Sequence, residues 1–185
     1  AAAVRSVVPA LTGPVPAISG TAAVGRTLTA KTGTWAAGTT LAFRWYRSGK
    51  AIKGATHKTY RLVAADRGKR LTVRVRGTKT GYAPARRSSE ATRAVAAGKL
   101  KTSTPRITGT RKAGRTLTAK TGTWAAGTTL AYRWYRSGKA IKGATHKTYR
   151  LVAADRKDKI RVRVTGSKPG YTTVRKYSAA TSRIR

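Results

Sequence analysis

Arginine and tyrosine side chains alternate with apolar residues in two segments of the chain, and they have the chemistry to bind anions. Arg44 and Tyr46 flank a tryptophan, and Arg74 and Arg76 flank a valine. Alternate side chains of a β-strand project to the same face, so each pair is expected to lie on one side of a sheet. Guanidinium groups carry forked donors that suit phosphate or carboxylate oxygens. Both segments therefore predict an anion-binding surface.

The same residues occur a second time because the chain is one module written twice. Residues 26–67 recur as residues 115–156 with a single difference, Phe43 against Tyr132. Tandem copies suit multivalent binding or spacing better than catalysis. Together with the lysines of each predicted hairpin, the candidate polyanion-binding residues are Arg44, Tyr46, Lys50, Lys53, Arg74, Arg76, Arg133, Tyr135, Lys139, Lys142, Arg161 and Arg163.

The composition also points to an anionic partner. The 185 residues include 41 Lys and Arg against 4 Asp and Glu, which gives a formal net charge of +37. Solubility alone is usually met by a net charge of about 2–8 in a small domain. The expected partner is a polyanion, and the candidates are an anionic cell-wall polymer, DNA or an acidic polysaccharide. The alternative is that the charge only keeps the protein soluble.

The acidic and histidine residues argue against catalysis and against a metal site. Asp66 and Asp155 stand at equivalent turns, where an aspartate most simply accepts hydrogen bonds from backbone amides or a nearby arginine. His57 and His146 lie one in each copy, without a second residue at metal-ligand spacing. The chain has no Cys and no phosphate-cradling glycine motif. We therefore expect a protein that is not an enzyme and has no cofactor and no metal.

The period of the apolar residues is two, which predicts an all-β fold. Leu71, Val73 and Val75 alternate with polar residues, and Ser48-Gly49 is typical of a hairpin turn. Many short strands joined by turns, in a repeat of about 90 residues, indicate a β-sandwich. The sequence thus predicts two tandem β-sandwich domains joined by a short linker.

The four tryptophans fall into two equivalent pairs. Trp45 and Trp134 lie on the inward side of their predicted strands and are expected in the core. Trp35 and Trp124 follow Gly-Thr at a strand end. They either cap the sandwich, which is the favoured interpretation, or stand exposed as stacking platforms.

The chain is expected to divide into four parts. Residues 1–15 form a proline-interrupted apolar arm, either an extended tail or a strand that pairs outside its own domain. Residues 16–96 form the first domain, residues 97–104 the linker and residues 105–185 the second domain. Self-assembly through residues 1–15 is a possible second interaction, and no apolar run reaches the ~20 residues of a membrane span.

The residues also carry a resemblance to a known family. The segments 45–55, 60–62 and 65–68, with Gly-x-Trp and Gly-x-Thr-Leu-Thr before them, resemble the immunoglobulin-like repeats of secreted and cell-surface proteins of Gram-positive bacteria. The resemblance implies an immunoglobulin-like sandwich, extracellular localisation and a role as spacer or binder. Two features depart from it: the paired cysteines of antibody-type domains are absent, and Lys157 replaces the turn glycine Gly68.

Two functions follow from these observations. The first is a secreted, non-catalytic protein that binds polyanions by multivalent electrostatics at a cell surface. The second is a structural subunit or spacer of an extracellular fibre or matrix, in which residues 1–15 dock on a neighbouring subunit.

Overall fold

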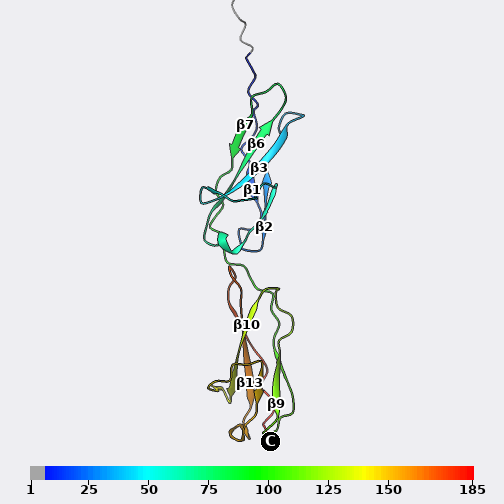
Figure 1. Cartoon of the computed structure of the whole chain (residues 1–185), viewed down its shortest axis with the longest axis vertical. Coiled ribbons are helices and arrows are strands. Elements are labelled where there is room, and N and C mark those ends of the chain that lie inside the picture. Colours follow the sequence, from blue (N-terminus) through cyan, green and yellow to red (C-terminus); the bar gives the residue numbers. More distant parts are fainter. Residues whose placement is uncertain (1–6) are drawn as a thin grey trace, which may run out of the picture. The chain divides into compact units, whose positions relative to one another are not determined.

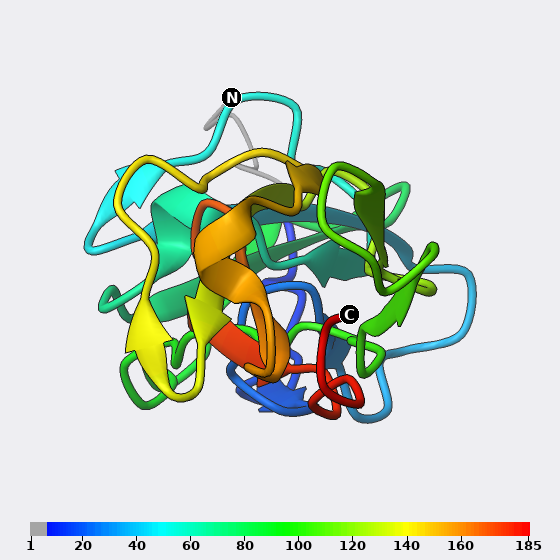
Figure 2. The same ribbon diagram turned by 90° about the horizontal axis from the view of Figure 1, so that it is seen from below.

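A computed structural model describes residues 7–185 of the chain, which divides into two compact units between Gly98 and Lys99. Both units consist of β-strands and one short 3₁₀ turn (Figure 1). The two-residue strands β4 and β11 close one hairpin in each unit, cyan in the first unit and yellow in the second in Figure 2. The all-β fold predicted from the alternation is confirmed.

The first unit is a sandwich of two antiparallel sheets. One sheet has three strands in the order β1-β2-β5 and the other has four in the order β4-β3-β6-β7. This strand order is that of an immunoglobulin-like sandwich. The elements are β1 (Ala17–Ser19), β2 (Thr27–Lys31), β3 (Thr40–Arg47), β4 (Lys50–Ala51), β5 (Thr59–Arg61), η1 (Ala64–Asp66), β6 (Leu71–Thr78) and β7 (Ala85–Ser88).

The second unit repeats this topology, with sheets in the orders β12-β9-β8 and β11-β10-β13-β14. Its elements are β8 (Arg106–Thr108), β9 (Thr116–Lys120), β10 (Thr129–Arg136), β11 (Lys139–Ala140), β12 (Thr148–Arg150), η2 (Ala153–Asp155), β13 (Ile160–Ser167) and β14 (Val174–Tyr177).

The core of each unit is built on one tryptophan of the long central strand. Trp45 is fully buried, stacks on Tyr60 with ring centroids 5.8 Å apart, and donates its indole N–H to the carbonyl of His57 at 2.9 Å. Trp134 makes the equivalent contacts in the second unit. Because the indole donor is satisfied, the large side chain is buried without an unpaired polar atom. The predicted core positions of both tryptophans are confirmed.

The hairpin between β3 and β4 has a two-residue loop, Ser48-Gly49, and both loop residues have positive φ, 43° and 82°. Positive φ at both central residues is the signature of a type I′ turn, whose twist matches that of the flanking strands. The turn fixes the register in which Arg47 lies opposite Lys50. Ser137-Gly138 forms the same turn between β10 and β11, with φ 40° and 86°.

Trp35 and Trp124 pack against glycine backbones and do not stand out as free platforms. A Cβ atom on Gly13 or Gly77 would collide with the ring of Trp35, and one on Gly166 would collide with that of Trp124. Both rings are half-buried, and their N–H groups donate to Thr32 and Thr121 carbonyls. Glycine inside β6 and β13 therefore has a packing reason, and the capping interpretation describes these residues.

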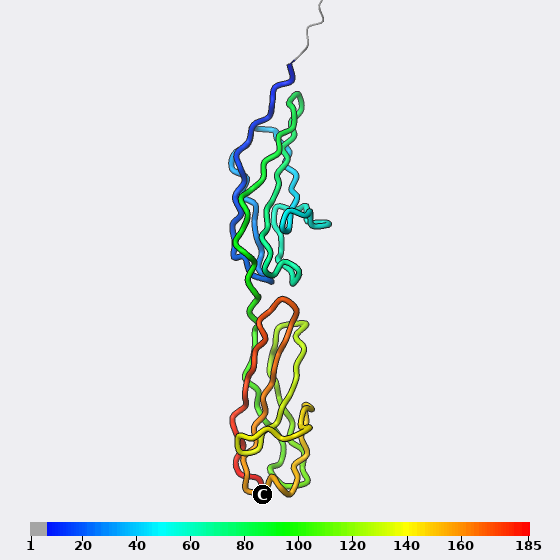
Figure 3. The backbone as a smooth tube through the Cα atoms, turned by 90° about the vertical axis from the view of Figure 1, so that its left-hand side faces the viewer, coloured from blue at the N-terminus to red at the C-terminus, as the bar shows by residue number. Residues whose placement is uncertain are grey.

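The segment around Leu11 belongs to the first unit. Ala10 forms a parallel bridge with Ala83, and Leu11 is 4% exposed. The side chain of Arg87 donates to the carbonyl of Gly13 at 2.9 Å. Figure 3 shows this dark blue segment running beside the green strands of its own unit. Residues 7–15 therefore do not form the predicted free tail or a strand that pairs outside its domain, because they pack on the first unit. Residues 1–6 of the predicted arm lie outside the described part of the chain.

The expected linker also differs from the structure. Residues 99–104 belong to the second unit, where they occupy the place that residues 10–15 take in the first. Leu100, the counterpart of Leu11, is 9% exposed. The Lys101 carbonyl accepts from the amide of Ala125, and the Ser103 hydroxyl donates to the Thr123 carbonyl at 2.9 Å. A polar, lysine-rich composition concealed this segment's buried leucine.

Candidate anion-binding face

The outward side of the four-stranded sheet of the first unit carries rows of arginines. Arg44 on β3 lies directly opposite Arg74 on β6, and Arg76 on β6 lies directly opposite Arg86 on β7. All four are exposed, while their strand neighbours Trp45, Val73 and Val75 are fully buried. We call the outward residues Arg44, Tyr46, Arg74, Arg76 and Arg86 the first basic face.

The first basic face forms a shallow depression, and one of its arginines stacks on its tyrosine. The guanidinium carbon of Arg74 lies 4.8 Å from the centroid of the Tyr46 ring, a cation–π contact that holds this long side chain in place. A shallow depression of about 400 Å³ is lined by all five residues of the face together with Ala42, Phe43 and Thr56. The face therefore offers a concave surface with several guanidinium donors.

Charge of one sign dominates this face. Like charges directly opposite each other on neighbouring strands are destabilising, and here two such arginine pairs lie side by side. Among residues 7–185, the ion pairs are Arg47–Asp66 and Arg136–Asp155, and neither involves the face. Within the described residues, neither ion pair offsets the cross-strand repulsion on this face.

The second unit carries a related face with a different pattern, which we call the second basic face: Arg133, Tyr135, Arg161, Arg163, Arg175 and Tyr177. Arg133 lies opposite Arg163, and Tyr135 lies opposite Arg161. The guanidinium of Arg161 lies 5.0 Å from the Tyr177 ring centroid, and that of Arg163 lies 5.9 Å from the Tyr135 ring.

Hydrogen bonding distinguishes two arginines of the second basic face. Arg161 donates its Nε–H to the carbonyl of Ser178 at 2.7 Å, so part of its donor fork is already used. The Nε atom of Arg163 is buried and has no hydrogen-bond partner within the described chain. A buried donor without a partner costs free energy, so the position of Arg163 is less favourable than that of Arg161.

The lysines of the β3–β4 and β10–β11 hairpins do not belong to the two basic faces. Lys50 lies opposite Arg47 and Lys139 opposite Arg136, so both are on the side of the sheet away from Arg44 and Arg133. Lys53 and Lys142 are exposed in the turns that follow. The structure thus brings the predicted arginines and tyrosines together in each unit, but places Lys50 and Lys139 apart from them.

Two arginines of the faces were missed by sequence reasoning. Arg86 and Arg175 occupy equivalent positions on the edge strands β7 and β14. The first is followed by Arg87, whose backbone lies opposite Val75 and whose side chain turns to Gly13. Two consecutive basic residues give no alternation signal, so only the strand register identifies which one joins the face.

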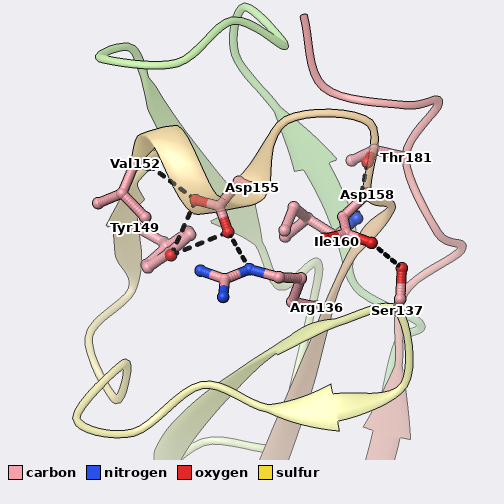
Figure 4. Close-up of polar contacts among 8 residues, drawn as sticks. All are labelled: Arg136, Ser137, Tyr149, Val152, Asp155, Asp158, Ile160 and Thr181. Atoms are coloured by element: carbon pink, nitrogen blue, oxygen red, sulfur yellow. Dashed lines mark hydrogen bonds and ion pairs between the residues drawn. The ribbon is translucent and has the colours of Figure 1, made fainter.

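The two buried aspartates have structural contacts. Asp155 is fully buried and accepts hydrogen bonds from the Arg136 guanidinium at 2.6 Å, from the Tyr149 hydroxyl and from the backbone amide of Val152 (Figure 4). Asp66 makes the same contacts with Arg47, Tyr60 and Val63. The expectation that these aspartates bind an arginine and a backbone amide is confirmed.

The same network shifts the titration of its partners. Burial and the neighbouring Asp66 raise the pKa of the Tyr60 phenol, and burial with Asp155 raises that of Tyr149. The hydrogen bond to Asp66 raises the pKa of the Arg47 guanidinium. Each shift favours the protonated form of the arginine or tyrosine beside the aspartate. The resulting hydrogen bonds link the 3₁₀ turn to the end of the long strand.

The two histidines make structural contacts, and the described residues show neither a metal-binding cluster nor a membrane-spanning helix. His57 and His146 are exposed, and their contribution is a backbone carbonyl that accepts from a core tryptophan. Over residues 7–185, no three His, Asp or Glu side chains gather into a possible metal site. In the same range, no helix has the length and apolar character needed to cross a membrane.

No protein-family model matches this sequence, and no curated protein matches it. Solved structures similar to it include three N-terminal domains of the outer capsid protein Hoc of bacteriophage RB49, with 18% identity and a TM-score of 0.40 over 89% of this chain. Murine CEACAM1b has 12% identity and a TM-score of 0.35, covering 91% of this chain and 98% of its own. The chicken interferon gamma receptor alpha chain has 8% identity and a TM-score of 0.37, covering 97% and 100%.

The chain spans 58% of the length of the phage fragment. At these identities and TM-scores, the likenesses say nothing about what this chain binds, and the description of its fold rests on its own strand order. Each half of the chain is an immunoglobulin-like β-sandwich, and the chain is a tandem of two.

Proposed function

We propose that this protein is a secreted, non-catalytic, cell-surface-associated binder of polyanions. The observation that carries the proposal is the pairing of arginines across neighbouring strands: Arg44 with Arg74, Arg76 with Arg86, and Arg133 with Arg163. Such pairs lower the stability of a sheet unless an anion lies between or above them. A net charge of +37 with four acidic residues, two of them buried in ion pairs, supports the same function.

Binding would proceed by multivalent electrostatics. Each guanidinium that neutralises a charge of the polymer releases condensed counterions, which makes the affinity strongly dependent on salt and insensitive to polymer sequence. Two tandem units raise the effective concentration of the second face once the first has bound. Polymers of the class expected are an anionic cell-wall polymer, DNA or an acidic polysaccharide.

A salt titration tests the proposal. For duplex DNA, the slope of log affinity against log salt is expected near −0.9 for each phosphate neutralised. Replacing Arg74 and Arg76 with serine should make the slope shallower, since both side chains are exposed and belong to the first basic face. A double variant of Arg26 and Arg61, which are exposed residues outside this face, removes the same charge and is the control. Affinities that do not respond to salt would refute the proposal.

A second candidate is a spacer or subunit of an extracellular fibre. It is favoured by the repetition of one sandwich unit along the chain, since repeated units set length in a fibre or spacer. Size-exclusion chromatography of the pure chain separates the candidates: polymers support the fibre, and monomers that bind polyanions support the binder.

A further inference from the structure

Resting on the proposed function, we propose that the depression of the first basic face is a discrete phosphate-binding subsite. Its ligand is a pair of phosphate groups of one polymer, one held by Arg44 and Arg74 and the other by Arg76 and Arg86. The second basic face lacks one of these two arginine pairs and binds the same groups more weakly.

The spacing of the arginines supports two phosphate positions. Residues directly opposite on antiparallel strands have Cβ atoms about 4.5–5.5 Å apart, so the two guanidiniums of a row can reach one anion together. The pair Arg44–Arg74 spans β3 and β6, and the pair Arg76–Arg86 spans β6 and β7. The two pairs are therefore offset by two residues along β6, about 7 Å at the usual rise of a strand, and by one interstrand spacing of about 4.8 Å across the sheet. The subsite is therefore matched to a chain that presents anionic groups repeatedly, and a single ion occupies half of it.

The facing guanidiniums favour phosphate over carboxylate. A carboxylate presents two oxygens whose lone pairs lie in one plane, and the fork of a single arginine takes one lone pair of each, so a second fork has to approach within that same plane. A phosphate group presents oxygens in tetrahedral directions, so two forks that approach from opposite strands can each find an acceptor. The concave lining, which includes Thr56 as a further hydroxyl, keeps these donors around one volume of about 400 Å³.

Tyr46 orders the subsite without competing for its ligand. Its ring lies beneath the guanidinium of Arg74, 4.8 Å from the ring centroid, and fixes that donor before the anion arrives. Pre-ordering an arginine removes part of the entropy that binding would otherwise cost.

The second unit supplies a natural comparison. The residue equivalent to Arg76 is Thr165, which lies opposite Arg175, so this row holds one arginine. The residue equivalent to Thr72 is Arg161, whose Nε–H is already given to the Ser178 carbonyl. The two faces carry the same number of arginines, but only the first arranges them in two facing pairs.

The test is a titration of the full chain with tripolyphosphate, observed through the Nε–H signals of arginine side chains by NMR. We expect the signals of Arg44, Arg74, Arg76 and Arg86 to shift together and at lower ligand concentration than those of the second basic face. Arg76→Thr, which copies the second unit, should weaken tripolyphosphate binding at this face by at least about tenfold, the loss of one charge-assisted contact. Arg61→Ser removes the same charge from the other sheet and should change the affinity less than twofold.

Benzene-1,2,4,5-tetracarboxylate, whose planar carboxylates give it a charge close to that of tripolyphosphate at neutral pH, should bind more weakly than tripolyphosphate in every variant. Equal losses in Arg76→Thr and Arg61→Ser, simultaneous shifts in both units, or equal binding of the two ligands would each overturn the subsite. Long-chain polyphosphate separates this failure from that of the proposed function. If the long chain binds with a steep salt dependence while the subsite results fail, general polyanion binding stands; if the long chain does not bind, both fail.

Discussion

Glycine residues make room for two tryptophan side chains in these small sandwiches. Trp35 lies against the backbone of Gly77 on β6 and of Gly13, and Trp124 lies against Gly166 on β13. A glycine within a strand normally weakens a sheet, but Gly77 and Gly166 make room for an indole ring. The arginines on the opposite face of the same strand are thereby carried by a well-packed element.

Gly77→Ala should destabilise the first unit by about 1–3 kcal/mol, because the added methyl overlaps the Trp35 ring in a packed region. Urea unfolding followed by tryptophan fluorescence measures the change. The control is the same substitution in a Trp35→Leu background, where the penalty should shrink. An equal penalty in both backgrounds would contradict the packing role of Gly77.

Tyr60 and Tyr149 should ionise later than the exposed tyrosines, because their pKa values are raised above the usual value of about 10. A group whose folded pKa is raised contributes stability that is complete below its unfolded pKa and is lost as pH rises through the folded pKa. The units should therefore lose stability on the alkaline side of pH 10. Absorbance titration of the tyrosines in the wild type and in Tyr60→Phe measures this late ionisation. If Tyr60→Phe loses none of the absorbance change at high pH, Tyr60 does not ionise late and the prediction is wrong.

For the strands, the sequence predicts the face on which a residue lies but not every pairing register. Period-two alternation predicts the faces of β3 and β6, and hence the placement of Arg44, Tyr46, Arg74 and Arg76. It does not give the register of the short edge strand β7, nor the side on which a hairpin lysine lies, because those depend on the turn and on pairing with a distant strand. Leu11 and Leu100 were missed for a related reason: one buried residue in a polar or proline-rich segment makes no pattern.

Leu11→Ala and Leu100→Ala should each cost about 2–5 kcal/mol in their own unit, since both leucines are buried although the sequence predicts an arm and a linker at these positions. Val15→Ala, at an exposed position of the same first segment, is the control and should be nearly neutral. Thermal unfolding by circular dichroism measures each change. Wild-type stability in Leu11→Ala would restore the free-arm interpretation.

On the scale of the whole molecule, the dominant fact is uncompensated positive charge. With 41 basic residues against 4 acidic ones, self-repulsion opposes folding at low ionic strength. Salt reduces this repulsion, because the Debye length falls from about 30 Å at 0.01 M to about 10 Å at 0.1 M.

The melting temperature should therefore rise as sodium chloride increases from about 0.01 to 0.1 M, and rise further with polyphosphate at equal ionic strength, because a bound ligand stabilises the folded state. Calorimetry in matched buffers measures both effects. A melting temperature insensitive to polyphosphate would speak against anion binding by the folded units, while one that falls with added chloride would contradict the self-repulsion argument.

The near-identity of the two units has a consequence for how the chain refolds. The residues of β3 and β10 that face the core meet matching partners: Trp45 opposite Val73 and Trp134 opposite Val162. Strands β3 and β10 differ only at Phe43 and Tyr132, and the core-facing residues of β6 and β13 differ only at Leu71 and Ile160. Core packing therefore gives β3 little means of choosing β6 over β13. Refolding should leave a fraction of molecules with strands exchanged between the halves, in an amount independent of protein concentration. Interrupted refolding followed by limited proteolysis would detect this fraction, and diversifying residues 115–156 should remove it.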